Sequence, residues 1–201
     1  MSSSETSLFD PQELRRLATL YDAKRYLFDI VSPRFAQTGT LPPYDFFAIV
    51  IWKSNRTKTK IARGLASIGK TVEALMREVS AASAPQFKVD LLLQVPGIGL
   101  AMASAILTVC YPDEFTVLDY RAWDTLRSSN VPGLPSRYPA TTTEYLQYCL
   151  ACKHFAQRVD LSLRDLDRAL WARDWEDDLL RLTRDMHCST CKAFIWLPPQ
   201  H

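Results

Sequence analysis

The sequence predicts an all-α fold, and three observations support this prediction. Only 6 of the 201 residues are glycine, while leucine, alanine and arginine are abundant, which favours helix. Apolar residues recur at intervals of three and four along several segments, as they do on the buried face of a helix. No two segments show the pattern that predicts a pair of strands. We therefore expect the 201 residues to form roughly eight to ten helices.

The first helix is predicted from Pro11 to about residue 31. Asp10 is a favoured N-cap residue, and proline is favoured in the first turn of a helix. Ser32-Pro33 is expected to end this helix, because proline lacks the backbone N–H that a continuing helix needs. Residues 39–43 are then predicted to form a loop.

The central helices are predicted from apolar patterns. Residues 46–52 are almost entirely apolar, which fits a buried strand or a buried helix, and the lack of partner strands favours a helix. Residues 61–79 carry a regular apolar stripe and are predicted to form one helix, which Ala84-Pro85 ends. Further helices are expected at residues 89–93, 100–109, 119–126, 145–159 and 163–175, with a last one to about 186 and a loop at 131–135.

Composition and charge narrow the class of protein. Hydrophobic residues make up 47% and charged residues 23% of the chain, which is typical of a globular protein and excludes a disordered one. The net charge of +2 is too small to indicate a partner, but its distribution is uneven. Residues 46–72 contain six basic residues and no acid, whereas residues 160–178 contain seven acids. Such a charge distribution can orient a protein on a polyanion.

The sequence also predicts the cellular compartment of the protein. The first residues lack the basic and apolar order of a signal peptide, and no apolar run reaches the ~18 residues of a membrane span. Five cysteines are an odd number for a disulfide framework. We therefore expect an intracellular monomer without a membrane partner, in the cytoplasm or, in a bacterium, associated with the nucleoid.

The most informative segment is Val95-Pro96-Gly97-Ile98-Gly99, which joins two predicted helices. Glycine suits a tight turn and a close backbone contact, and the apolar residue between the two glycines is expected to turn inward and hold the helices together. The free amides at the start of the second helix would then form an anion site that fits a DNA phosphate. The alternative is a plain turn between two helices that binds nothing.

Residues 95–103, 106–107 and 115–123 together resemble the helix-hairpin-helix DNA glycosylase superfamily. The resemblance implies a two-lobed helical bundle that contains this motif. It also implies a catalytic aspartate about twenty residues beyond the hairpin, at a position that Asp119 matches. The predicted segments are residues 1–35, which pack with the C-terminal lobe, a helical domain at 36–130, and a C-terminal helical segment at 131–201.

This resemblance implies a monofunctional DNA N-glycosylase of base excision repair that removes a damaged or mismatched base and needs no cofactor. A fixed carboxylate at Asp119 would stabilise the positive charge that develops on the deoxyribose and orient water. Bifunctional members of the superfamily carry a lysine where this chain has Ala101, so strand cleavage through an imine is expected to be absent. Two alternatives stay open: Asp119 only caps a helix, and the protein is a DNA-binding module without catalytic activity.

Basic side chains are expected to add affinity for DNA. Lys53, Arg56, Lys60 and Arg63 are predicted to share one helical face and to neutralise a few phosphates. The alternative is an ordinary solvated helix surface. The predicted DNA-binding residues comprise the motif residues Val95, Pro96, Gly97, Ile98, Gly99 and Ala101, and the basic residues Lys53, Arg56 and Lys60.

Two other motifs point to different chemistry. Residues 64–71 match the P-loop pattern G-x-x-x-x-G-K-[ST], but no predicted strand precedes them, which argues against a nucleotide-binding protein. Cys149 and Cys152 form one Cys-x-x-Cys pair, and Cys188 and Cys191 form another. Four thiolates would suit zinc, but the first pair lies in a predicted amphipathic helix and the pairs are far apart, so no metal is expected.

Overall fold

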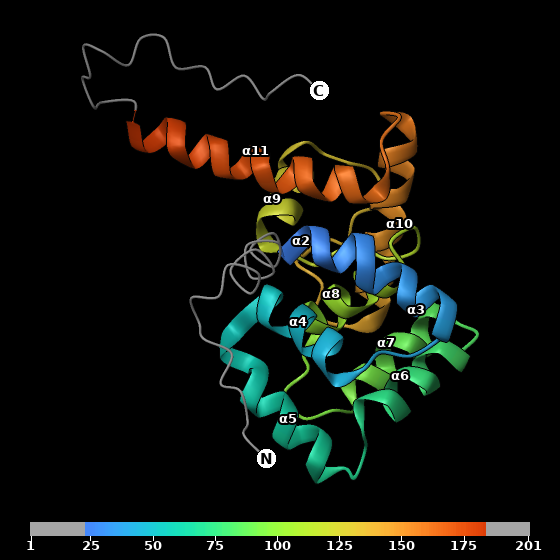
Figure 1. Ribbon diagram of the computed structural model, residues 1–201. Coiled ribbons are helices and arrows are strands. Elements are labelled where there is room, and N and C mark those ends of the chain that lie inside the picture. The colour runs from blue at the N-terminus through green and yellow to red at the C-terminus, as the bar shows by residue number, and fades with distance from the viewer. Residues whose placement is uncertain (1–22, 184–201) are drawn as a thin grey trace.

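The computed structural model describes residues 23–183, and within them the chain is helical without any strand, which confirms the predicted all-α fold (Figure 1). The helices are α2 (Ala23–Tyr26), the π-helix η1 (Leu27–Val31), α3 (Ser32–Thr38), α4 (Pro43–Ser54), the 3-10 helix η2 (Asn55–Thr57), α5 (Lys58–Ser67), α6 (Val72–Ala81), α7 (Pro85–Leu93), α8 (Leu100–Cys110), α9 (Tyr120–Ser128), α10 (Thr142–Arg158) and α11 (Leu163–Thr183). None of these helices is long and apolar enough to cross a membrane.

The first described helices, α2, η1 and α3, follow one another without a break, so the prediction that Ser32-Pro33 ends the helix is wrong. The π turn of η1 lies directly before the proline, and the Ser32 amide donates to the Leu27 carbonyl. The wider turn changes the hydrogen-bonding register just where proline has no N–H to donate. The helix ends instead at Gly39, whose positive φ of 65° suits glycine. The N-terminal half of the predicted helix lies outside the described residues.

Residues 61–79 form two helices rather than the single helix that their apolar stripe predicts. Helix α5 ends at Ser67, and Gly69 adopts a positive φ of 63°. Thr71 then caps α6, because its side chain accepts a hydrogen bond from the Ala74 amide at 3.1 Å. A left-handed glycine and a threonine cap therefore interrupt the stripe, whose apolar residues reach the core except Ile68, which is exposed at the break.

Helix α8 lies at the centre of the molecule, where it packs against α4, α7 and α3 (Figure 1). Its residues 102–110 are all buried. The two alanines, Ala103 and Ala105, are fully inaccessible to solvent, which allows neighbouring helices to approach closely. The predicted helix at 100–109 is confirmed.

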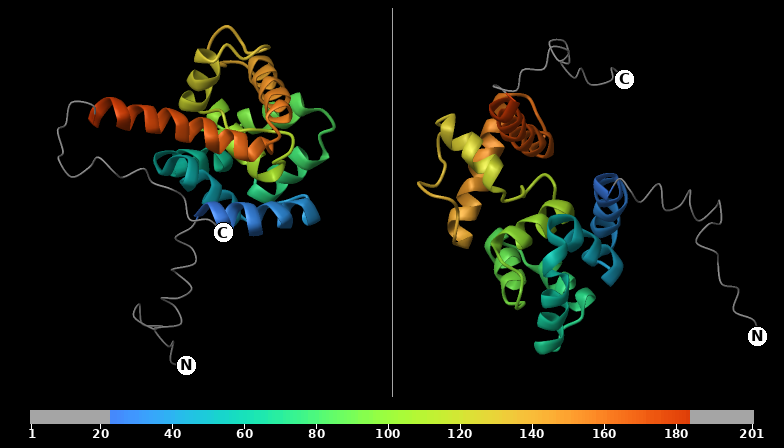
Figure 2. Two further views of the ribbon diagram at one scale, coloured as in Figure 1. Left: turned by 90° about the horizontal axis from the view of Figure 1, so that it is seen from above. Right: turned by 90° about the vertical axis from the view of Figure 1, so that its left-hand side faces the viewer.

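Helices α9, α10 and α11 gather on one side of the molecule, while α2 to α8 gather on the other (Figure 2). Helix α11 is continuous, so the predicted division into two helices near residue 175 is wrong for the described part. It packs along α9, where the Arg121 guanidinium forms ion pairs with Asp174 and, at 2.6 Å, with Asp178. Part of the acidic cluster predicted from the sequence thus joins two helices.

Candidate active site

The turn between α7 and α8 has the local structure that its two glycines predict. Gly97 has a φ of 103°, which favours glycine, and the Ile98 amide donates to the Val95 carbonyl at 3.0 Å. Ile98 is buried in the core, as expected for the residue between the glycines. Val95 is buried as well, so the side chains of these two predicted DNA-binding residues face the protein interior.

One side of this turn rests on α5. A Cβ atom added to Gly64 would lie 2.0 Å from the Pro96 carbonyl oxygen, and one added to Gly97 would lie 3.1 Å from the backbone carbon of Lys60. Both contacts involve backbone atoms. The two glycines therefore allow the turn and the helix to touch directly.

The other side of the turn is open. Within residues 23–183, the backbone amides of Gly97, Gly99, Leu100 and Ala101 donate no hydrogen bond. Gly99 is exposed, and no atom lies within 4 Å of a Cβ built on it. Ala101 is half-buried in the first turn of α8. The start of α8 thus presents unpaired donors and the positive end of the helix dipole.

The four basic residues do not share one helical face, so this prediction is wrong. Ser54 has an extended backbone, with φ −162° and ψ 98°, and it separates α4 from the following helices. Arg56, Lys60 and Arg63 line a shallow depression of about 490 Å³ together with Pro96. These three side chains therefore lie next to the turn, whereas Lys53 belongs to α4 and takes a different direction.

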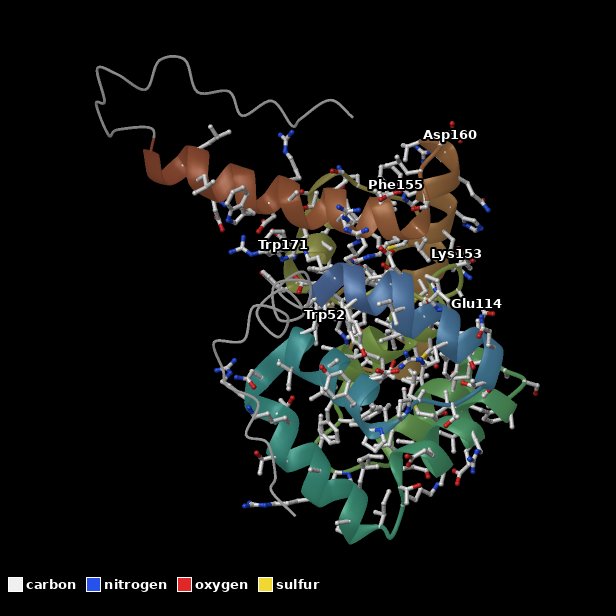
Figure 3. The ribbon with its side chains drawn as sticks, in the orientation of Figure 1. Trp52, Glu114, Lys153, Phe155, Asp160 and Trp171 are labelled. Atoms are coloured by element: carbon white, nitrogen blue, oxygen red, sulfur yellow. The ribbon has the colours of Figure 1, made fainter. Side chains whose placement is uncertain are left out.

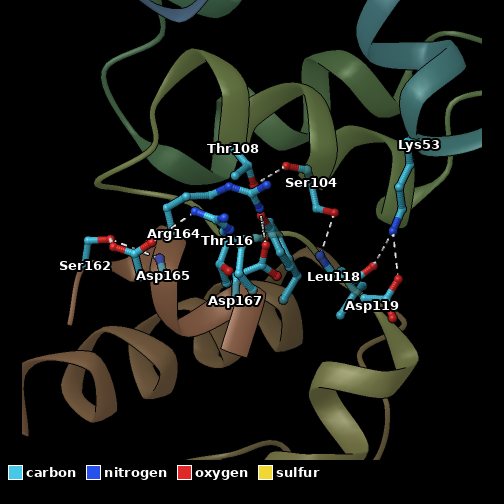
Figure 4. A network of polar contacts seen from close by, with 12 residues as sticks. Lys53, Ser104, Thr108, Thr116, Leu118, Asp119, Ser162, Arg164, Asp165 and Asp167 are labelled. Atoms are coloured by element: carbon cyan, nitrogen blue, oxygen red, sulfur yellow. Dashed lines mark hydrogen bonds and ion pairs between the residues drawn. The ribbon is translucent and has the colours of Figure 1, made fainter. Parts of the chain in front are cut away.

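Asp119 occupies the N-cap position of α9. Its Oδ1 accepts the Arg121 amide at 3.0 Å, so the capping role considered from the sequence is confirmed. Its Oδ2 lies 3.2 Å from Nζ of Lys53 (Figure 4). The preceding residue is fixed as well, because the Leu118 amide donates to Oγ of Ser104 at 2.8 Å. The carboxylate is therefore held in a defined position by three different elements.

A pocket of about 750 Å³ opens beside this carboxylate, which we call the Asp119 pocket. Its lining includes Trp52, Lys53, Asp119, Arg164, Asp165, Asp167, Arg168 and Trp171. Trp52 on α4 and Trp171 on α11 come from the two groups of helices, and Figure 3 shows both side chains. The volume lies in the range of small-molecule sites.

Arg164 and Asp167 form an ion pair at the wall of this pocket. The Arg164 guanidinium lies 4.2 Å from the ring centroid of Phe28 and 5.7 Å from that of Trp52. Burial raises the pKa of Asp167 to about 6, although the Arg164 charge opposes this shift. Burial also lowers the pKa of Arg164. Three carboxylates therefore line the pocket in different environments: Asp119 is partly exposed, Asp165 is exposed and Asp167 is buried.

Sequence reasoning missed this side of the pocket. Arg164, Asp167, Arg168 and Trp171 are spaced three and four residues apart, so they share one face of α11. This spacing is visible in the sequence, but it does not show that the face meets Asp119, 45 residues earlier.

Neither competing motif forms its site in the described residues. Gly64 lies inside α5 and Lys70 pairs with Glu78, so residues 64–71 do not form a phosphate-binding loop after a strand. Cys149 and Cys152 are buried in α10, and burial raises the pKa of both thiols.

The second cysteine pair, Cys188 and Cys191, lies outside the described residues. Within residues 23–183, no three His, Cys, Asp or Glu side chains are arranged to hold a metal ion.

Comparisons of the chain with protein-family models, with curated proteins and with solved structures found no match.

Proposed function

We propose that the protein is a DNA N-glycosylase that uses water to release a damaged or mismatched base. The observation that carries this proposal is the position of Asp119, whose carboxylate caps α9 and at the same time lines a pocket large enough for a flipped nucleotide. Such a carboxylate stabilises the positive charge that builds up on the sugar as the N-glycosidic bond breaks.

The open side of the turn supports a DNA backbone contact. Within residues 23–183, the amides of Gly97, Gly99, Leu100 and Ala101 donate no hydrogen bond, and Gly99 is exposed, which suits a phosphate oxygen. Arg56, Lys60 and Arg63 lie next to the turn and add positive charge. Contacts of this kind position DNA without reading its sequence.

The Asp119 pocket supports binding of a base outside the helix stack. Trp52 and Trp171 offer aromatic surfaces on which a base can stack. Arg164 and Asp167 offer hydrogen-bond donors and acceptors for its edge. The pocket thus combines stacking surfaces, polar groups and a carboxylate for the sugar.

The test is base release from duplexes that carry uracil, an oxidised base, an alkylated base or a mismatch. We expect release from at least one duplex and its loss in Asp119→Asn, with DNA binding retained. Asp113→Asn is the matched control, since Asp113 is an exposed carboxylate outside the pocket. DNA binding without release from any duplex would instead support a DNA-binding module without catalytic activity.

The backbone contact has a separate test in Gly99→Ser. A serine hydroxyl at the N-cap can accept a hydrogen bond from the Ala101 amide, which would then no longer be available to a phosphate. We expect weaker binding to any duplex, with the fold intact. Unchanged affinity would contradict the proposed use of these amides.

A further inference from the structure

Both oxygens of the Asp119 carboxylate are engaged within the protein itself. Oδ1 accepts the Arg121 amide at 3.0 Å, and Oδ2 lies 3.2 Å from Nζ of Lys53, which also donates to the Leu118 carbonyl oxygen at 3.4 Å (Figure 4). The side chains of Lys53 and Asp119 are 16% and 29% exposed, so solvent screens their ion pair less than it screens a surface pair. A positive charge is therefore already bound at the carboxylate that is proposed to stabilise a sugar cation.

This ion pair opposes the chemistry proposed for Asp119. A carboxylate stabilises a cation through its uncompensated negative charge, and an ammonium 3.2 Å away offsets much of that charge. The same ammonium repels the positive charge that develops on the sugar. The lysine therefore has to leave the carboxylate before the N-glycosidic bond breaks.

Lys53 is free to move in a way that the other cation at the pocket wall is not. The Arg164 guanidinium lies over one aromatic ring of η1 and one of α4, which hold it in place. Within residues 23–183, the hydrogen bonds of the Lys53 amine all go to residues 118 and 119. Its flexible stem starts at the penultimate residue of α4, so the amine can exchange one anionic partner for another.

We propose that a phosphate of the bound DNA takes Lys53 over from Asp119 and so frees the carboxylate for the reaction. This inference rests on the proposed function, and in it Lys53 is a positioning residue that acts through Asp119. The phosphates on either side of a nucleotide are bonded to its sugar, so a sugar that reaches Asp119 brings an anion to the lysine in the same pocket. Lysine binds a phosphate as a point charge, as it binds a carboxylate, so the exchange replaces one ion pair by another.

The exchange makes the reaction depend on a phosphorylated strand. A nucleoside without phosphates that enters the Asp119 pocket meets a carboxylate that Lys53 still neutralises. A nucleotide within a DNA strand removes the lysine as it binds. Substrate binding thus creates the uncompensated negative charge that the reaction needs.

The test compares duplexes that carry a normal phosphate or an uncharged methylphosphonate beside the target nucleotide, on its 5′ or its 3′ side. The full chain is saturated with DNA, and base release is measured in a single turnover. In the wild type, the methylphosphonate should slow release by about tenfold or more at one of the two positions, because Lys53 then stays on Asp119. In Lys53→Met, which lacks the amine, the same change should alter the rate by less than about twofold.

Two further readouts separate the exchange from an ordinary contact. On the normal duplex, Lys53→Met should bind more weakly and yet release the base at the wild-type rate once it is saturated. Lys58→Met is the matched control, because Lys58 is exposed and its amine donates to the nearby Asn55 side chain. This control should respond to the methylphosphonate as the wild type does.

The outcomes distinguish the two proposals. Equal slowing of the wild type and Lys53→Met would overturn the exchange, and so would a wild type that is not slowed at either position; in both cases base release leaves the proposed function standing. Loss of release in Lys53→Met on the normal duplex, with an unchanged circular dichroism spectrum, would show that the lysine is needed beside Asp119 and would also overturn the exchange. If the wild type releases no base from any duplex, both proposals fail.

Discussion

Gly64→Ala is the most direct test of how the turn is supported. The added Cβ would lie 2.0 Å from the Pro96 carbonyl oxygen and 2.9 Å from its carbonyl carbon. Non-bonded atoms of this kind rarely approach within roughly 3.0 Å, so α5 and the turn would have to separate by about 1 Å. Both partners are backbone, so no side chain can rotate to relieve the contact.

The expected loss follows from two opposing effects. Overpacking of this kind costs about 3 kcal/mol or more where the backbone must move. Replacing glycine by alanine inside a helix returns about 1 kcal/mol. We therefore expect the free energy of unfolding to fall by about 2 kcal/mol, measured by urea denaturation. The matched control is Gly99→Ser, which has open space around the new side chain and introduces a favoured N-cap residue.

The comparison of the two variants decides the outcome. Gly99→Ser should change the stability by less than about 0.5 kcal/mol or increase it slightly. A loss below about 1 kcal/mol in Gly64→Ala would show that the helix does not support the turn in the way described here.

Two further predictions concern titration and reactivity. Because burial raises the pKa of Asp167 to about 6, the stabilisation that this carboxyl contributes is present below about pH 4 and is lost as the pH rises through 6. Urea denaturation across this range should show that the free energy of unfolding falls by up to about 3 kcal/mol, and Asp167→Asn should remove this decline. An equal decline in the variant would contradict this assignment. Buried thiols with a raised pKa should resist alkylation, so iodoacetamide at pH 8 should leave Cys110, Cys149 and Cys152 unmodified in the native protein. In urea, the same three thiols should be alkylated. Rapid labelling of any of them in the native state would refute their burial.

Much of the fold could be predicted because apolar patterns determine which segments are buried. The helices at α4 and α8 follow from nearly continuous apolar runs, and the positive φ of Gly97 and the burial of Ile98 follow from the glycine spacing. The predicted helix boundaries were wrong where a local interaction determines the backbone conformation. A π turn carries the helix past Pro33, and the Thr71 cap starts a new helix within one apolar stripe.

The candidate site was only half predictable for a related reason. The resemblance implies an aspartate after an apolar segment at the start of a helix, and Asp119 matches that position. The remainder of its pocket comes from α11, and nothing in the spacing of Arg164 and Trp171 indicates which distant residue they meet. Lys53 was assigned to a surface because its neighbours in the sequence are basic, but α4 ends at Ser54, and the lysine lies against the carboxylate.

A single hydroxyl group connects the two ends of the proposed binding surface. Oγ of Ser104 donates to the Ala101 carbonyl at 2.8 Å, in the first turn of α8, and accepts the Leu118 amide at the same distance, one residue before Asp119. The hydroxyl therefore connects the first turn of α8, where the unpaired amides lie, to the residue before the carboxylate. If a DNA strand binds those amides through a phosphate, the distance from them to Asp119 determines which nucleotide of that strand can reach the carboxylate.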